Sequence, residues 1–259
     1  MDAEHLHTSA VYVQEFTMAD NEQKYIRVRL KFSRKGPVKY LGHLDMLRYF
    51  QKVMLRANID IRYSEGFNPH QIMSFAYPLG VSMETTGDYL DIDLVSYDGL
   101  EDLVTRLNKV MNEGIAIESA KLLEEKALNA MAAVYAAGYK ITVSSNEMDQ
   151  ADLAKDKLDL MCQNLLAKPE IIISKKKCGK KKKEEVVEKD IKEGIFELKA
   201  DSDNVLYMLL KSGSALNIKP VSVIEALSEN IGKNLKVEAI LRTDIYGQAE
   251  DGSIVSLSQ

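Results

Sequence analysis

Two histidines lie in the most basic part of the sequence and are the residues best suited to move protons. His43 begins a helix-like segment, and His70 ends the polar turn sequence GFNPH. Imidazole titrates near neutral pH, so one histidine could deprotonate an RNA 2′-hydroxyl while the other protonates the leaving oxygen. The pair also fits purely structural roles, in which His43 caps the helix and His70 is hydrogen-bonded within its turn. Both interpretations stay open on sequence alone.

A basic strand precedes these histidines and supplies groups that bind phosphate. Residues 25–33 read YIRVRLKFS, in which basic and apolar residues alternate. This period of two is typical of a half-buried strand, and it places Arg27, Arg29 and Lys31 on the face opposite the apolar residues. The pattern predicts a cationic sheet face that holds an RNA backbone. The same residues would also serve as an ordinary solvated face.

The net charge of −5 hides an uneven distribution. The chain has 259 residues, with 34 lysines and arginines against 39 aspartates and glutamates. Residues 24–80 hold eleven of the basic residues and three of the acidic ones, so this segment carries +8 and the remainder −13. A localised polyanion site is compatible with an acidic total, because phosphates respond to the local field.

Further polar candidates lie near the helices and near the carboxyl end. An Asp45–Arg48 pair is expected on one helix face, since the residues are three apart. The serines, Asn217 and Lys219 of SGSALNIKP precede a helix start, where free backbone N–H groups bind anions, although Pro220 there is also ordinary helix initiation. Arg242 and Tyr246 could stack on a base or be plain surface residues. The predicted RNA-binding residues are Arg27, Arg29, Lys31, Lys39, Arg48, Asn68, His70, Ser74, Asn217, Lys219, Arg242 and Tyr246.

Several kinds of protein are disfavoured by the sequence. It has no GxxxxGK[ST] or GxGxxG loop, no HExxH and no CxxC, so neither a cofactor nor a metal is expected. Two cysteines, Cys162 and Cys178, are too few for a disulfide framework and favour a reducing, cytoplasmic setting. No stretch approaches the roughly 18 apolar residues of a membrane span, and residues 1–10 do not resemble a signal peptide.

The order of the predicted elements indicates two similar halves. Each half reads strand, helix, strand, strand, helix, strand, which is typical of α+β ferredoxin-like domains. The prediction is a tail at residues 1–24, one domain at 25–128 and a second at 129–259, with a lysine-rich hairpin tip or loop at 174–185. Residues 59–64 are expected to form a short strand, and residues 186–191 to continue the main sheet.

Specific motifs resemble a known family. They are GHLD at a helix start, GFNPH, PLGVSME followed by YLDIDL, and a late NIKP. Over roughly residues 25–246 the chain is similar to the radical SAM-linked protein family, a bacterial domain of unknown function found beside or fused to a radical SAM protein. The signature falls on Gly42, His43, Asp45, Arg48, Gly66, Phe67, Asn68, Pro69, His70, Ser74, Gly80, Glu84, Asn217, Lys219, Pro220, Arg242 and Tyr246. Gly42 departs from the usual serine, and the lysine-rich insertion after Ile173 departs from the pattern.

The resemblance implies a radical SAM partner but no activity. The leading hypothesis is therefore an RNA-binding accessory protein that presents structured RNA, such as tRNA or rRNA, to a separate radical SAM modification enzyme. Tandem ferredoxin-like halves with a basic strand and a histidine near the first helix also resemble RAMP endoribonucleases, so a metal-independent ribonuclease using His43 and His70 is one alternative. A protein-interaction module without RNA binding is the other.

Overall fold

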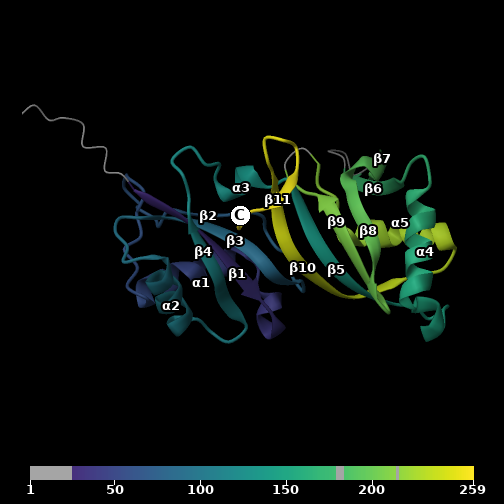
Figure 1. The fold of residues 1–259 in the computed structure, drawn as a ribbon, viewed down its shortest axis with the longest axis horizontal. Helices are drawn as coiled ribbons and strands as arrows, with labels where there is room; N and C mark the ends of the chain where they lie inside the picture. Colours follow the sequence, from purple (N-terminus) through teal and green to yellow (C-terminus); the bar gives the residue numbers. More distant parts are fainter. Residues whose placement is uncertain (1–24, 179–183, 214–215) are drawn as a thin grey trace, which may run out of the picture.

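The computed structural model describes residues 25–178, 184–213 and 216–259. They form a mixed α+β fold around one nine-stranded sheet, in which seven strands follow the order β4-β1-β3-β10-β5-β9-β8 (Figure 1). The α+β prediction is confirmed. The tail predicted at residues 1–24, the tip of the lysine-rich block at 179–183 and Ser214 of the predicted anion site lie outside the described residues.

The first half supplies four strands and two main helices. Its elements are β1 (Ile26–Arg34), a 3-10 turn (Gly36–Tyr40), α1 (His43–Arg56), β2 (Met73–Phe75), β3 (Glu84–Leu94), α2 (Leu100–Val110) and β4 (Ile115–Leu122). β1 lies between β3 and β4, and β2 pairs with β3. Apolar residues alternate along β1 and β3, and they pack against α1 and α2 because both helices are amphipathic.

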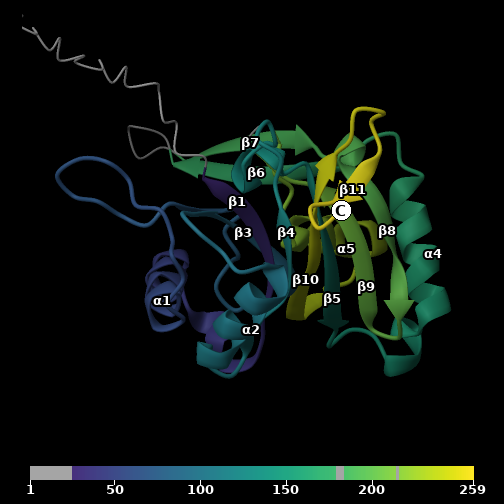
Figure 2. The same ribbon diagram turned by 60° about the vertical axis from the view of Figure 1, so that its left-hand side comes forward.

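The second half follows a short connecting helix, α3 (Ala130–Ala133). Its elements are β5 (Ala136–Ser144), α4 (Lys155–Leu166), β8 (Ile195–Ser202), β9 (Val205–Lys211), α5 (Pro220–Ile231), β10 (Lys236–Gln248) and β11 (Ile254–Ser256), with 3-10 turns at Gln150–Leu153 and Lys192–Gly194. Figure 1 shows α1 and α2 together at one end of the molecule and α4 and α5 at the other, and Figure 2 shows α1 and α2 on the side opposite α4.

The two halves share one continuous sheet. β10 runs parallel to the beginning of β3, with Leu241 opposite Glu84 and Arg242 opposite Thr85. On its other edge β10 pairs antiparallel with β5. The junction between the halves, here called the seam, is therefore made by the first residues of β3 and the middle of β10.

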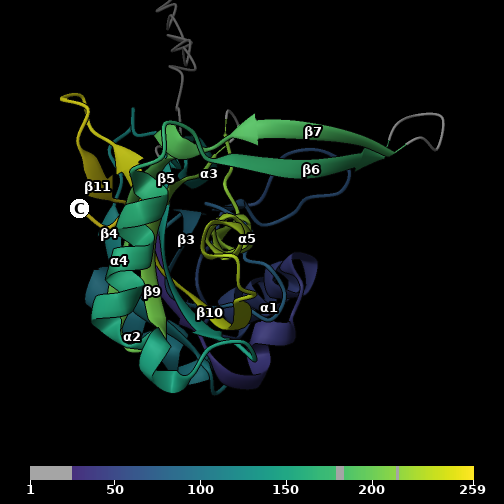
Figure 3. The ribbon, with the colours of Figure 1, turned by 90° about the vertical axis from the view of Figure 1, so that its right-hand side faces the viewer.

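Two strand predictions are wrong. Residues 59–64 make only isolated bridges, Ile61 with Leu94 and Tyr63 with Gln71. Residues 186–191 do not continue the main sheet: β7 (Glu184–Asp190) pairs with β6 (Ile172–Cys178) in a separate two-stranded ribbon. Figure 3 shows this ribbon running out beyond α5. The two strands pair with each other because they are consecutive in the chain, and local pairing is the usual outcome.

The sheet of the second half has one covered and one open face. Along β9, Leu206, Met208 and Leu210 are buried in the core that α4 and α5 share. The alternate residues of β5, β8 and β9 project to the opposite side, which we call the open face. No helix in the described part of the chain is long and apolar enough to span a membrane.

Candidate nucleic-acid interface

The three cations of β1 that were predicted to bind RNA, Arg27, Arg29 and Lys31, are all bound within the protein. Arg29 forms a buried ion pair with Asp91, with 2.7 Å between Nε and Oδ1. Lys31 Nζ lies 2.9 Å from Asp244 Oδ2. Arg27 donates to the carbonyl oxygen of Ala127 at 2.9 Å. These side chains therefore stabilise the sheet, and β1 does not present the free cationic face that its alternation suggests.

The acidic partner of Arg29 comes from a neighbouring strand with the same alternation. The YLDIDL segment of β3 places Asp91 directly opposite Arg29 and on the same face. Asp91 also accepts from the backbone N–H of Ala130 at 2.6 Å, and Arg29 donates to the carbonyl of Leu128 at 3.0 Å. The connection between the halves thus covers this part of β1. The alternating aspartates in the sequence were a signal for this pairing.

The basic residues Lys39 and Arg48, near the start of α1, are partly or largely exposed and weakly paired. The predicted Asp45–Arg48 pair is present at 3.6 Å, with both side chains more than half exposed. Lys39 lies 3.8 Å from Glu84. Exposed pairs of this kind contribute little stability, about 0–1 kcal/mol, so these cations can exchange partners with a phosphate at small cost.

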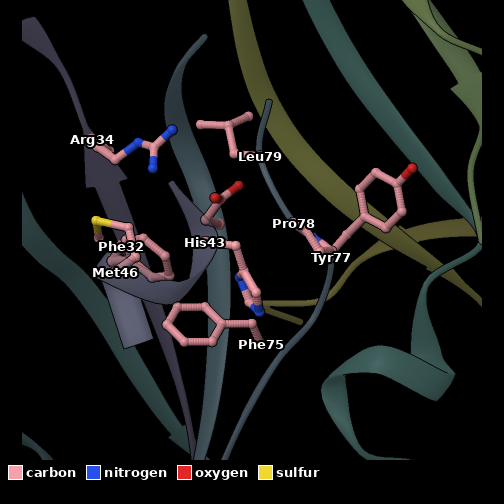
Figure 4. A pocket seen from close by; sticks show the side chains of 9 residues that line it. Phe32, Arg34, His43, Met46, Phe75, Tyr77, Pro78 and Leu79 are labelled. Atoms are coloured by element: carbon pink, nitrogen blue, oxygen red, sulfur yellow. The ribbon is translucent and has the colours of Figure 1, made fainter. Parts of the chain in front are cut away.

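The two histidines are not brought into one site. His43 is the first residue of α1, so Gly42 and not His43 is the N-cap, and the His43 ring packs edge-on against Phe75 at 5.3 Å between ring centroids (Figure 4). His70 Nδ1 is 2.8 Å from Ser64 Oγ in the exposed turn. Phe75 follows His70 by five positions along largely extended chain, so the two residues are about 16 Å apart, given a rise of ~3.3 Å per residue. This geometry gives no support to an acid–base pair of His43 and His70. The hydrogen bond of His70 within its turn is the one expected if the residue has a structural role.

The remaining residues of the turn have separate positions. Asn68 is exposed, while Ser74 lies in β2 opposite Asp91 and is partly buried. Neither residue lines the small cavity beside His43. That cavity has a volume of about 10 Å³, and Arg34 and Asp88 are among the residues that line it. Figure 4 shows His43 over Phe75 with Arg34 and Tyr77 farther along the same cavity. That volume is near the minimum for one water molecule.

A buried charge cluster lies at the seam. Arg242 is 1% exposed and donates through Nε to Asp88 Oδ1 at 2.7 Å, with a second hydrogen bond from Nη2 to the same oxygen. Arg34 is also buried, and its Nε has no hydrogen-bond partner among the described residues. Burial lowers the pKa of Arg34; Asp88 opposes this effect, and the charge of Arg242 adds to it. Two guanidinium groups and one carboxylate are therefore buried at the seam, and the carboxylate is paired with Arg242.

A larger cavity opens beside this cluster. This seam pocket has a volume of about 270 Å³ and is lined by Tyr77, Pro78, Gly80, Met83, Tyr139, Asn217, Ile218, Lys219, Pro220 and Arg242. Three predicted RNA-binding residues, Asn217, Lys219 and Arg242, thus come together from two distant segments. Lys219 is exposed, and none of the described carboxylates forms an ion pair with it.

Tyrosines form two walls of the seam pocket that sequence reasoning missed. Burial raises the pKa of both Tyr77 and Tyr139, so their hydroxyls stay protonated and can donate. Tyr77 stands in the YPLG segment before β3, and Tyr139 faces Arg242 across β5 and β10. Tyr139 reaches the seam only through the long-range pairing of β5 with β10, which the sequence near Tyr139 does not indicate. Tyr77 lies within the YPLG motif, so it alone had a local sequence signal.

The last predicted contact, Tyr246, lies away from the seam pocket. It is partly buried on the open face, and its pKa is raised by burial and by neighbouring Tyr207. Tyr207 is therefore a further residue that the sequence prediction missed.

Comparison with protein-family models places the chain in a bacterial family. Residues 27–220 match the family model described as an uncharacterized protein conserved in bacteria (DUF2344). None of the curated proteins matches the chain.

Proposed function

We propose that this chain, which belongs to the bacterial family of uncharacterized proteins DUF2344, is an RNA-binding accessory protein. The single observation that carries the proposal is the seam pocket, which gathers Asn217, Lys219 and Arg242. The predicted kinship with a bacterial domain of unknown function is confirmed by this membership.

The charge of the pocket favours an anionic ligand. Arg34, Lys219 and Arg242 lie at or beside it, and Asp88 is the carboxylate paired with Arg242. Tyr77 and Pro78 line both the seam pocket and the small cavity, so the cations act on one region. Buried positive charge without matching negative charge is unfavourable, and a bound phosphate would relieve it.

The shape of the pocket supports a nucleotide. Its volume is close to the lower end of the roughly 300–1,000 Å³ range of small-ligand sites. Tyr77 and Tyr139 offer aromatic walls and hydroxyl donors, and the pocket lies at the N-terminus of α5, which begins at Pro220 and carries the positive end of the helix dipole. A single unpaired nucleotide of an RNA fits this description, whereas a duplex does not.

The sheet order supports tandem ferredoxin-like halves. If the strands of the sheet are numbered along the chain within each half, both halves have the same order across the sheet: fourth, first, third, second. These orders are β4-β1-β3-β2 and β10-β5-β9-β8. Ferredoxin-like and RAMP-like RNA-binding domains are built from this split βαβ arrangement. This is an argument from architecture, and the site carries the functional part.

The proposal includes presentation of RNA to a radical SAM enzyme in the cytoplasm. The motif resemblance supports the partner, and the sparse cysteines support a reducing compartment. Co-purification with a radical SAM protein that is lost after nuclease treatment would fit RNA-mediated presentation. Co-purification that persists after nuclease and in high salt would favour a protein-interaction module instead.

Filter binding of a structured RNA tests the role of the pocket. We expect Lys219→Ala to weaken binding roughly 10-fold, as loss of one charge-assisted phosphate contact does. Lys233→Ala is the matched control, because Lys233 is exposed just beyond the other end of α5. Equal affinities of the wild type and Lys219→Ala would remove the pocket from the proposal.

A further inference from the structure

The open face of the second half carries aromatic side chains between lysines. Tyr207 lies on β9 directly opposite Lys140 of β5 and Lys199 of β8. Lys199 Nζ is 5.4 Å from the centroid of the Tyr207 ring. Tyr246, from β10, lies close enough to Tyr207 for their hydroxyls to influence each other's pKa.

A glycine on the central strand makes room for these two rings. A Cβ atom at Gly138 of β5 would lie 3.2 Å from Tyr207 Oη and 3.4 Å from Tyr246 Cε2. It would also lie 2.7 Å from Thr243 Oγ1, closer than real Cβ contacts. Glycine at this position therefore lets side chains from β9 and β10 lie over β5.

A second aromatic pair lies toward one end of the same face. The rings of Tyr135 and Phe196 are stacked, with centroids 5.6 Å apart and planes inclined by 16°. Lys211 Nζ lies over the Tyr135 ring. Phe196 is 37% exposed, and Tyr135 is partly exposed. Lys211 pairs with Ala136, which is also opposite Tyr246, so the two aromatic groups are neighbours.

We propose that this aromatic face (Tyr135, Phe196, Tyr207 and Tyr246) binds a short single-stranded segment of RNA by base stacking. The inference rests on the proposed RNA-binding function and adds the form of RNA that the protein recognises. Aromatic side chains on neighbouring strands of an open sheet stack unpaired bases, whereas bases within a duplex are already stacked on one another.

Stacking, more than charge, supplies the affinity of this face. Lys199 is paired with Glu197 at 2.5 Å, Lys140 with Asp201 at 2.7 Å and Lys31 with Asp244 at 2.9 Å. Phosphates must compete with these carboxylates, so few counterions are released on binding. The contribution of the aromatic face should consequently depend little on salt.

The aromatic face and the seam pocket can be tested separately. On β5, Tyr139 lines the seam pocket and its neighbour Lys140 projects to the open face, since successive strand residues point to opposite sides. Substitutions on the aromatic face therefore leave the lining of the seam pocket unchanged.

Affinity for single-stranded and duplex RNA oligonucleotides tests the inference. Tyr207→Leu and Phe196→Leu should each weaken single-strand binding roughly 5- to 150-fold, the range for loss of one base stack. The salt slope should not change, because no charge is removed. Tyr207→Phe keeps the ring and should bind like the wild type. Tyr40→Leu is the matched control, since Tyr40 is exposed on the other half with Lys39 Nζ 5.6 Å from its ring.

The outcomes separate the two proposals. Wild-type affinity in both Tyr207→Leu and Phe196→Leu, each with an unchanged melting temperature, would overturn the aromatic face and leave RNA binding intact. Failure of the wild type to bind any RNA would overturn the proposed function itself. Phe196 is partly exposed near the sheet edge, so its variant is expected to fold even if Tyr207→Leu does not.

Discussion

Arg242 shows how burial changes the role of a charged side chain. Its sequence context suggested a base-stacking residue, but it is 1% exposed and held by Asp88 and by the carbonyl of Tyr77. One edge of the guanidinium joins β10 to β3 while the residue still lines the seam pocket. Arg242 is therefore placed to position the other residues of the seam pocket, and its burial prevents it from stacking on a base at the surface.

Breaking this pair should be costly. Arg242→Met leaves Asp88 buried without its main partner, and loss of one member of a buried pair costs about 3–5 kcal/mol. Urea unfolding should show a correspondingly lower midpoint. Arg48→Met is the control, because the exposed Asp45–Arg48 pair should contribute at most about 1 kcal/mol. Similar losses in both variants would contradict the structural role of the seam pair.

Cys162 gives a prediction for thiol chemistry and pH. Burial, with the charge of Asp159, raises the pKa of its thiol to about 12. In Cys178→Ser, the remaining thiol should react with a disulfide reagent at about pH 8 only after unfolding, since the thiolate is the reactive form. The folded state holds this proton more tightly than the unfolded state, so its contribution to stability is complete below pH 9.0 and declines as pH rises toward about 12. Rapid reaction of the folded protein would contradict this burial.

At the scale of elements, periodicity predicted much of the chain. The helix-like segment expected to begin at His43 corresponds to α1, and the alternation of residues 25–33 corresponds to β1. The alternation of β1 alone could not reveal that its polar face would be neutralised; the aspartates of YLDIDL were a signal for the partner of Arg29, but alternation gave none for Asp244. Those contacts join residues 62 and 213 positions apart, so they depend on the fold of the whole chain. The parallel pairing of β3 with β10 was hidden for the same reason.

The β6–β7 ribbon should be dispensable for the main fold. Its strands pair with each other and with no strand of the main sheet in the described part of the chain. Replacing residues 176–185 by a short glycine-rich turn retains Ile171, Ile173 and Ile191, which belong to the core. The melting temperature should change by only a few degrees, roughly the effect of 1 kcal/mol or less. Loss of cooperative melting would show that the ribbon is structurally required.

At the scale of the molecule, the uneven charge has a different meaning from the one first suggested. The +8 segment at residues 24–80 is partly consumed by buried and cross-strand ion pairs. Of the residues predicted to bind an anion, Lys219 and Arg242 lie together at the seam, where both line the seam pocket. RNA affinity should therefore arise from a few localised contacts on a protein whose total charge is −5, and unspecific coating of nucleic acid should be weak.

The most direct test of the central claim is the salt dependence of RNA binding by the wild type and Lys219→Ala. The wild type should bind RNA at about 50 mM salt, with affinity that falls as salt rises. Lys219→Ala should reduce the slope of log K against log salt by about 0.7–0.9, the value for one phosphate contact, while Lys233→Ala should leave it unchanged. Absence of wild-type binding at about 50 mM salt, where such contacts are strong, would contradict the proposed function.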